Sequence, residues 1–184
     1  QDICIGNTPT PISLSGYLGT IQWQSSTTNS SGTFTNMVGE TNNGLVTSSI
    51  DNTTTKFYQA IVKNGVCPAV ASIVAAVNIS QLPVPGTVSL TGNSTVCYGT
   101  TGAGLPVITL SGSSGNIQWQ SSSTPNGVYT NTAGTTSPVI DNTATKYYQA
   151  KVSSGPCGSA TSIPIVVNVD PLSVAGTIDN PTPR

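Results

Sequence analysis

Histidine is absent from this sequence of 184 residues, and charged residues make up only 6% of it. The 5 basic residues are too few for a surface that neutralises nucleic-acid phosphates or binds anionic lipid headgroups. No apolar run approaches the ~18–20 residues that a membrane-spanning helix needs. We therefore expect no nucleic-acid partner and no direct insertion into a membrane.

The lack of histidine also restricts catalysis. It excludes Ser-His-Asp and Cys-His nucleophile arrangements and imidazole metal ligands. A glycosidase would need two carboxylates that face each other across a cleft. The acidic residues are instead scattered along the sequence, at Asp2, Glu40, Asp51, Asp141, Asp170 and Asp179. We predict a non-enzymatic protein with no catalytic residue, no cofactor and no metal site.

The strongest positive signal is an internal repeat. The segment Ile21–Ser26 recurs unchanged as Ile117–Ser122, and Asp51–Ala60 returns as Asp141–Ala150 with two substitutions. Matched positions lie about 90 residues apart, a length that suits a small domain. The sequence therefore predicts two similar domains in tandem.

The matched segments also place the domain boundaries. We predict the first repeat over residues 1–82 and the second over residues 83–171. The tail, residues 172–184, is predicted to be the lead-in of a following repeat, because Gly176–Asp179 matches Gly86–Ser89. On this basis we expect the chain to be part of a longer array.

Each repeat has the pattern of a β-sandwich. Short alternating runs of apolar and polar residues are bounded by Gly, Pro, Asn and Ser, without helical periodicity. Several short strands within about 90 residues favour two packed sheets. In the first repeat we expect strands near Ile12–Ser15, Thr20–Ser25, Thr33–Val38, Leu45–Ile50, Lys56–Lys63 and Ala71–Ile79.

Alternation along the strands assigns their faces. Ile61 of the first repeat is replaced by Lys151 in the second, so this position faces water, and Phe57 and Gln59 share its face. The opposite face forms the core. In the first repeat we expect the core to contain Ile12, Leu14, Ile21, Trp23, Tyr58, Ala60, Val62, Ile73, Ala75 and Val77. Its counterparts are Ile108, Leu110, Ile117, Trp119, Tyr148, Ala150, Val152, Ile163, Ile165 and Val167.

The outward face carries side-chain amides beside an aromatic ring, a combination that suits carbohydrate binding. A simpler explanation is that Gln keeps the sheet soluble and that aromatic residues favour strands. Both interpretations stay open. The candidate glycan-binding face consists of Gln22, Gln24, Phe57, Gln59, Gln118, Gln120, Tyr147 and Gln149.

Four cysteines are divided equally between the repeats, one early and one late in each. Of the three possible pairings, the repeat favours a disulfide within each domain, Cys4–Cys67 and Cys97–Cys157. Zinc is the competing interpretation, but histidine and C-x₂-C pairs are both missing. Disulfides imply an oxidising compartment and therefore an extracellular protein.

Asp51 and Asp141 precede the penultimate strand of their repeats. Such residues are calcium ligands in some proteins, but calcium takes about six to eight oxygens, usually from several carboxylates. A single aspartate per turn is more typical of an Asx turn, in which the carboxylate accepts backbone N–H groups. We predict Asx turns at both positions.

The order of these landmarks resembles the Ig-like repeats of very large surface proteins of Bacteroidota, including gliding-motility adhesins of the SprB type that the type IX system exports. The resemblance covers nearly the whole chain and implies an all-β protein of two tandem Ig-like β-sandwich domains, each with one intradomain disulfide. The matching residues are Cys4, Trp23, Thr55, Tyr58, Gly65 and Cys67, and Cys97, Trp119, Thr145, Tyr148, Gly155 and Cys157.

Members of that family act as stalks that hold an adhesive tip away from the cell. The resemblance thus implies a non-enzymatic structural segment of a long extracellular adhesin or surface filament, used in cell attachment and gliding motility. Its partners would be neighbouring repeats of the same chain, with surface glycans or other cells as outer targets. The alternative is a carbohydrate-binding accessory module of a secreted enzyme. A third interpretation is a fibre that assembles through its edge strands.

Overall fold

The structure, a computed structural model, describes residues 1–178 and divides into two compact units. Unit 1 comprises Gln1–Leu82 together with Ser154–Gly158, and unit 2 comprises Pro83–Ser153 and the residues from Ser159 onward. Of the predicted lead-in, residues 172–178 form no helix or strand, and residues 179–184 lie outside the described part. Among the described residues, no helix has the length and hydropathy needed to cross a bilayer.

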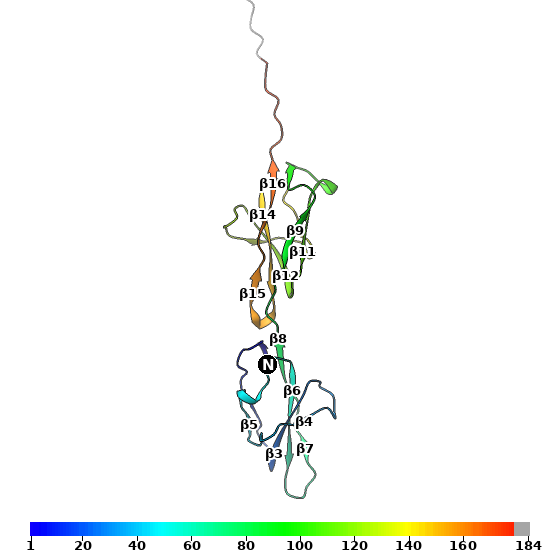
Figure 1. Ribbon diagram of the computed structural model, residues 1–184, viewed down its shortest axis with the longest axis vertical. Coiled ribbons are helices and arrows are strands. Elements are labelled where there is room, and N and C mark those ends of the chain that lie inside the picture. The colour runs from blue at the N-terminus through cyan, green and yellow to red at the C-terminus, as the bar shows by residue number, and fades with distance from the viewer. Residues whose placement is uncertain (179–184) are drawn as a thin grey trace, which may run out of the picture. The chain divides into compact units, whose positions relative to one another are not determined.

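Unit 1 consists of two β-sheets (Figure 1). All neighbours in the larger sheet are antiparallel except β1 and β8, which are parallel. Its strands follow the order β1 (Asp2–Cys4), β8 (Ala75–Ser80), β6 (Lys56–Lys63), β3 (Thr20–Ser26) and β4 (Thr35–Asn36), and β7 (Val70–Ala71) also pairs with β6. The smaller sheet pairs β2 (Ile12–Ser13) with β5 (Gly44–Leu45), which the 3-10 helix η1 (Thr47–Ser49) follows.

Unit 2 repeats this plan, with one longer pair of strands. Its larger sheet has the order β10 (Thr95–Cys97), β16 (Ile165–Asp170), β14 (Lys146–Ser153), β12 (Asn116–Ser122) and β13 (Thr130–Asn131), and β15 (Ser159–Thr161) also pairs with β14. Its smaller sheet pairs β9 (Thr87–Thr91) with β11 (Val107–Ser111), and its 3-10 helix is η2 (Gly102–Gly104). The 3-10 helix η3 (Gly155–Cys157) lies in the segment that belongs to unit 1. The predicted all-β architecture of two sandwich domains is confirmed.

A small core lies between the two sheets of each unit. In unit 1, Trp23 and Tyr58 from the larger sheet pack in one buried cluster with Leu45 from the smaller sheet. In unit 2, Trp119 and Tyr148 pack with Ile108 in the same way. The alternation read from the sequence therefore placed the two aromatic residues of each core on the correct face.

Three residues predicted to be buried are exposed: Ile117 on β12, at 40%, and the isoleucines at positions 73 and 163. Ile73 is 93% exposed and Ile163 is 86% exposed. The predicted final strand is broken before them, at Ser72 and Ser162. The Ser72 Oγ atom accepts a hydrogen bond of 3.0 Å from the Ala60 backbone N–H, and the Ser72 N–H donates to the Ala60 carbonyl. Because this serine ends the pairing with β6, the chain turns and the next isoleucine points outward.

The cysteine pairing also differs from the prediction. Among residues 1–178 the structure contains one disulfide, which joins Cys4 to Cys157, and the thiols of Cys67 and Cys97 are free and exposed. The predicted pairs Cys4–Cys67 and Cys97–Cys157 are therefore wrong.

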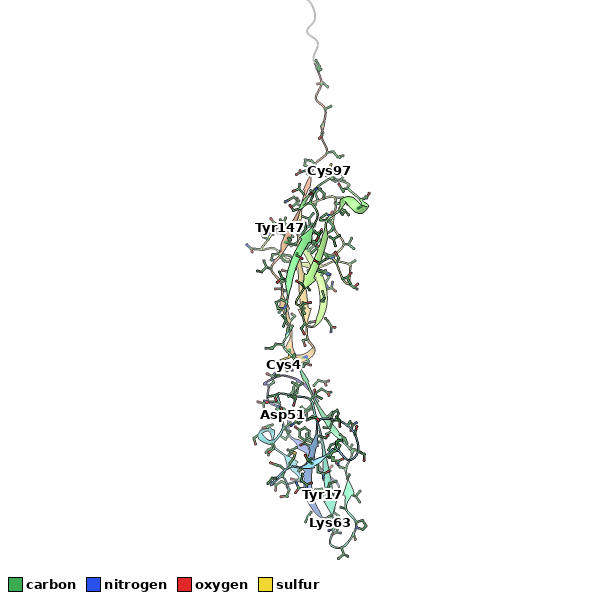
Figure 2. The ribbon with its side chains drawn as sticks, turned by 45° about the vertical axis from the view of Figure 1, so that its right-hand side comes forward. Cys4, Tyr17, Asp51, Lys63, Cys97 and Tyr147 are labelled. Atoms are coloured by element: carbon green, nitrogen blue, oxygen red, sulfur yellow. A yellow bond between two sulfur atoms is a disulfide. The ribbon has the colours of Figure 1, made fainter. Side chains whose placement is uncertain are left out.

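Strand pairing explains why Cys4 does not reach Cys67. In β1, Cys4 lies opposite Ser80 of β8, and β8 runs antiparallel to β6, so Cys4 lies beyond the Lys56 end of β6. Cys67 follows the other end of β6, at Lys63. Eight residues at roughly 3.3 Å each span about 25 Å, whereas the Cα atoms of a disulfide lie ~4.4–6.8 Å apart. Figure 2 shows Cys4 and Lys63 at opposite ends of unit 1.

The same distance separates the predicted pair of the second repeat. Cys97 lies opposite Asp170, beyond the Lys146 end of β14, and Cys157 follows the Ser153 end. In both repeats the early and late cysteines are therefore held at opposite ends of the larger sheet.

Candidate functional site

The candidate glycan-binding face of unit 1 is assembled by the pairing of β3 with β6. The register places Gln24 directly opposite Gln59. The Gln59 Nε2 atom donates a hydrogen bond of 2.8 Å to Gln24 Oε1, and the Gln24 Nε2 atom donates one of 2.8 Å to Asn36 Oδ1 on β4. Three side-chain amides thus form a continuous ladder across three strands.

The second repeat has the same ladder on β14, β12 and β13. The Gln149 Nε2 atom donates to Gln120 Oε1 at 3.1 Å, and the Gln120 Nε2 atom donates to Asn131 Oδ1 at 3.0 Å. The ladder is therefore a property of the repeat. The asparagine at its end was not predicted as a member of the face, although Asn36 lies within the predicted strand Thr33–Val38.

The four members of the candidate glycan-binding face in each unit form a stripe along the sheet. The remaining glutamine of this stripe also donates hydrogen bonds within its own domain. The Gln22 Nε2 atom donates to the backbone carbonyls of Trp23 at 2.9 Å and Met37 at 2.8 Å. In unit 2, Gln118 donates in the same way to the carbonyls of Trp119 and Thr132. These amides fasten the edge of the larger sheet to the chain that follows β4 and β13.

The aromatic members of the stripe are half-buried. Phe57 lies opposite Ser26 on β3 and Ala76 on β8, and Tyr147 lies opposite Ser122 and Val166. The structure thus brings the eight predicted residues together as four in each unit. The Nε2 atoms of the six glutamines all donate to neighbouring protein groups, which favours a structural role. Glycan binding stays a prediction.

One hollow borders this stripe in unit 1. It has a volume of about 390 Å³ and is lined by Gln22 and Gln24 together with Ile61 and Lys63. Its lining combines amide, aliphatic and ammonium groups on an open surface. At this hollow a polar ligand can reach Gln22 and Gln24.

Asp51 forms the predicted Asx turn. Its Oδ1 atom accepts hydrogen bonds from the backbone N–H groups of Thr53 at 2.7 Å and Thr54 at 3.2 Å. The hydroxyl groups of both threonines also donate to the carboxylate, and Lys56 Nζ lies 3.0 Å from Oδ2. The hydrogen bonds from Thr53 and the nearby ammonium hold the pKa of Asp51 well below its usual range, against the opposing effect of burial.

Asp141 repeats this turn with fewer contacts. Its Oδ1 atom accepts from the Thr143 N–H at 2.9 Å and from the Thr143 hydroxyl at 2.6 Å, and Lys146 Nζ lies 3.9 Å from Oδ2. The hydrogen bonds from Thr143 again lower the pKa of the carboxyl group. Each carboxylate thus accepts hydrogen bonds from its own turn. No group of three or more His, Cys, Asp or Glu residues within residues 1–178 is arranged to hold a metal ion.

The tyrosine of each core is hydrogen-bonded to the same turn from the side of the core. The Tyr58 hydroxyl oxygen accepts a hydrogen bond of 2.9 Å from the Asp51 backbone N–H, and Tyr148 accepts one of 2.7 Å from Asp141. Burial raises the pKa of both phenols. The ring therefore fills the core while its hydroxyl fixes the chain that enters β6 or β14.

The repeated threonine before the lysine has an equally local task. The Thr55 hydroxyl oxygen accepts a 2.9 Å hydrogen bond from the Ile79 backbone N–H, and Thr145 accepts one of 2.9 Å from Val169. It thus ties the start of the tyrosine strand to the final strand. Most of the repeated motif is explained by folding and not by ligand binding.

The two core tryptophans differ in their polar contacts. The Trp23 Nε1 atom donates a 2.8 Å hydrogen bond to the Asn42 carbonyl, in the loop between β4 and β5. The equivalent loop of the second repeat is shorter. The buried Trp119 Nε1 atom finds no hydrogen-bond partner within residues 1–178.

Comparison with solved structures gives distant likenesses. One match is a Ca²⁺-stabilized adhesin described as helping an Antarctic bacterium reach out and bind ice, with 11% sequence identity and a TM-score of 0.37. The alignment covers 96% of this chain and 48% of the adhesin, so this chain spans about half of its length. A TM-score this low carries no argument about this protein. The comparison with curated proteins found no match.

A family model gives a direct assignment. The model of the domain of unknown function DUF8696 matches residues 1–81 and again residues 84–171. The two matches coincide with the two copies of the repeated motifs and together cover most of the chain. The chain therefore belongs to the family of the domain DUF8696 and contains that domain twice.

Proposed function

We propose that this chain is a non-enzymatic structural segment of a long extracellular adhesin or surface filament, of the kind found in the SprB-type gliding adhesins of Bacteroidota. The observation that carries the proposal is the Cys4–Cys157 disulfide, which joins residues 153 positions apart in a chain of two tandem domains. A pull on the two ends of the chain passes through this bond and bypasses the residues between Cys4 and Cys157. Of the second repeat, only the part after Cys157, with β15 and β16, lies in its path. Such a covalent path suits a segment that bears load.

The polar residues of the repeat support the same role. Its amides, aspartates and core tyrosines are engaged with neighbouring groups of their own domain. A composition with only 6% charged residues leaves a nearly neutral surface. Residues used in this way stabilise a small sandwich with few aromatic residues, which is what a repeated spacer needs.

The disulfide also supports the proposed location. Disulfide bonds persist in oxidising compartments and are rare in the reducing cytosol. This chemistry supports an extracellular position, and the proposal places the load-bearing segment at the cell surface. Antibodies against the chain should then label intact cells, and labelling that requires permeabilised cells would contradict the location.

A length-matched replacement tests the spacer role. In the protein that contains this chain, the chain is deleted or is replaced by an unrelated pair of β-sandwich domains of equal length. Deletion should lower cell attachment, and the replacement should restore it, because a spacer contributes length and not recognition. A replacement that leaves attachment as low as the deletion would contradict the proposal.

Carbohydrate binding is the second candidate function, because the hollow beside Gln22 and Gln24 offers amides next to an aliphatic side chain. In this case the chain would be an accessory module of a secreted enzyme or the adhesive part of the filament. The isolated chain would then bind defined oligosaccharides on a glycan array. Binding that is lost in Gln24→Ala and kept in Gln81→Ala would put this function ahead of the spacer role.

A further inference from the structure

The two free cysteines occupy the same places in their repeats as the two bonded ones. Cys97 is the early cysteine of the second repeat and corresponds to Cys4, and Cys67 is the late cysteine of the first and corresponds to Cys157. The bonded pair therefore joins an early cysteine to the late cysteine of the next repeat. The free pair consists of the early cysteine of the second repeat and the late cysteine of the first.

The backbone around Cys97 has the form that it has around Cys4. Cys4 lies opposite Ser80 in a parallel strand pair, and Cys97 lies opposite Asp170 in the equivalent pair. The residue after each cysteine donates its N–H group, at 2.9 Å, to the carbonyl of that partner. The strand end that carries the early cysteine therefore has the same pairing and the same backbone hydrogen bond in both repeats.

The turn around Cys67 likewise matches the turn around Cys157. The Cys67 N–H donates to the Asn64 carbonyl at 3.0 Å, and the Cys157 N–H donates to the Ser154 carbonyl at 2.8 Å. Both turns contain a glycine in the left-handed region, with φ of 55° at Gly65. The equivalent Gly155 has φ of 43°. In both repeats the late cysteine thus follows a hydrogen-bonded turn with a left-handed glycine, and this turn is a 3-10 helix, η3, only around Cys157.

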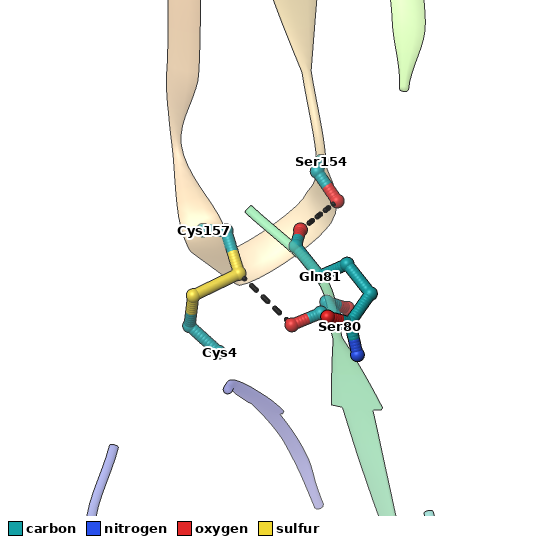
Figure 3. The surroundings of a disulfide bond; sticks show 5 residues. All are labelled: Cys4, Ser80, Gln81, Ser154 and Cys157. Carbon is teal, nitrogen blue, oxygen red and sulfur yellow. Dashed lines mark hydrogen bonds between the residues drawn. A yellow bond between two sulfur atoms is a disulfide. The ribbon is translucent and has the colours of Figure 1, made fainter. Parts of the chain in front are cut away.

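Figure 3 shows how the turn that carries Cys157 contacts Cys4 and the end of β8. The Ser154 hydroxyl donates a 2.6 Å hydrogen bond to the Gln81 carbonyl, and Cys157 Sγ lies 3.2 Å from the Ser80 carbonyl oxygen. The Cα atoms of Cys4 and Cys157 are 4.9 Å apart, and Cys4 is only 6% exposed. In contrast, Cys97 is exposed because no such turn covers it.

We propose that Cys97 and Cys67 are the two halves of a second linkage of the same kind. Cys97 accepts the late cysteine of another repeat of this family, and Cys67 bonds to the early cysteine of another repeat. Repeats of this family then join head to tail through disulfides. The inference rests on the equivalence of the two repeats and does not depend on the adhesive function.

The linkage needs an oxidant, for which a small-molecule disulfide suffices. A Cys97 thiolate attacks the small disulfide and releases one of its halves as a thiol. The thiolate of Cys67 then attacks the mixed disulfide and releases the second half. Two cysteine thiols are oxidised to one S–S bond, and one small disulfide is reduced to two thiols.

Two copies of this chain provide the test. Cys67→Ser keeps Cys97 as its free thiol, and Cys97→Ser keeps Cys67, while both retain the Cys4–Cys157 bond. Each variant is incubated with oxidised glutathione, alone and mixed with the other, and the products are separated on non-reducing gels and mapped by mass spectrometry. The mixture should form a Cys67–Cys97 dimer in about tenfold excess over either symmetric dimer, a selectivity that corresponds to about 1.4 kcal/mol.

A cysteine introduced away from these strand ends and turns serves as the control. Ser31 is exposed, and the triple variant Ser31→Cys, Cys67→Ser, Cys97→Ser, mixed with Cys67→Ser, should form no such excess. The wild-type chain should form a ladder of linked products. Symmetric dimers in equal or greater amount, a Cys67–Cys97 bond found within single chains, or linkage no faster than in the Ser31→Cys control would each overturn the proposal.

Discussion

Trp23 and Trp119 are the same residue in two repeats, yet the Trp23 indole donates a hydrogen bond and the Trp119 indole finds no acceptor within the described residues. Both rings are at least 98% buried, so replacement by Phe removes a similar volume from each core. Trp23→Phe also leaves the Asn42 carbonyl without its donor. We therefore expect Trp23→Phe to cost about 1 kcal/mol more stability than Trp119→Phe.

Urea unfolding of the two variants checks this difference. The shared loss of ring volume cancels in the comparison, so the remaining difference reports the indole hydrogen bond. Equal losses would show that Trp119 is as well satisfied as Trp23 in solution, for example by a water molecule. A larger loss in Trp119→Phe would contradict the assignment.

The Asp51 carboxylate predicts a dependence of stability on pH. Its pKa is lower in the folded protein than in the unfolded chain, so its contribution is complete above the unfolded pKa of ~3.9 and is lost as pH falls through the folded pKa. The urea midpoint for the unfolding of unit 1 should fall steadily from pH of about 5 to pH of about 2. In Asp51→Asn, stability at neutral pH should be lower and the fall on acidification smaller.

The second repeat supplies an internal comparison for this effect. Asp141 has fewer hydrogen bonds, and its lysine lies 3.9 Å away instead of 3.0 Å. Asp141→Asn should therefore change the pH dependence less than Asp51→Asn does. A larger change in Asp141→Asn would show that the two turns have been ranked incorrectly.

At the scale of single residues, alternation along the strands and local turn patterns were sufficient for several correct predictions. The burial of Trp23 and Tyr58 and the Asx turn at Asp51 were all accessible in this way. The outward position of Ile73 was not, because the break at Ser72 depends on one hydroxyl replacing a strand contact. Such a break leaves the apolar pattern of the sequence unchanged.

The amide ladder acts at the scale of the sheet, because it crosses three strands. Gln24 occupies its centre, where it accepts from Gln59 and donates to Asn36. Gln24→Ala removes two hydrogen bonds worth about 0.5–1.5 kcal/mol each and should lower the free energy of unfolding of unit 1 by about 1–2 kcal/mol. Thermal and urea unfolding measure the loss.

A matched substitution separates the ladder from the general cost of removing a glutamine. Gln81 is exposed and lies outside the ladder, so Gln81→Ala should leave stability nearly unchanged. If Gln24→Ala were equally neutral, the ladder would not stabilise the sheet. Its presence in both repeats would then favour a ligand.

The cysteine pairing shows what can be read from elements and what was overlooked. Strand β6 was predicted in the correct place, and its length separates Cys67 from the end at which Cys4 lies by about 25 Å. Counting residues along β6 excludes a bond between Cys4 and Cys67 only once β1 has been placed beside β8. The correct partner was beyond prediction, because the short strand β1 and its parallel pairing with β8 leave no clear mark on the sequence.

On the scale of the whole chain, the disulfide decides how force is transmitted. The Cys4–Cys157 bond encloses both core tryptophans and most of the strands in one covalent loop. A pull on the termini extends the residues outside the loop and leaves the enclosed residues without load. Further links of the kind proposed for Cys67 and Cys97 would extend this protection along successive repeats.

Single-molecule force spectroscopy makes this prediction quantitative. The variant Cys67→Ser, Cys97→Ser, held at its two ends, should gain about 500–550 Å of contour length on complete unfolding when a reductant is added, because the bond removes a separation of 153 residues at ~3.3–3.6 Å each. The added substitution Cys4→Ser should give the long contour without reductant. The oxidised chain should show no unfolding event from the sandwich of unit 1, and in unit 2 only β15 and β16, which follow Cys157, should be pulled away. If it reached the long contour while still oxidised, the bond would not form in solution, and the load path proposed for this segment would be wrong.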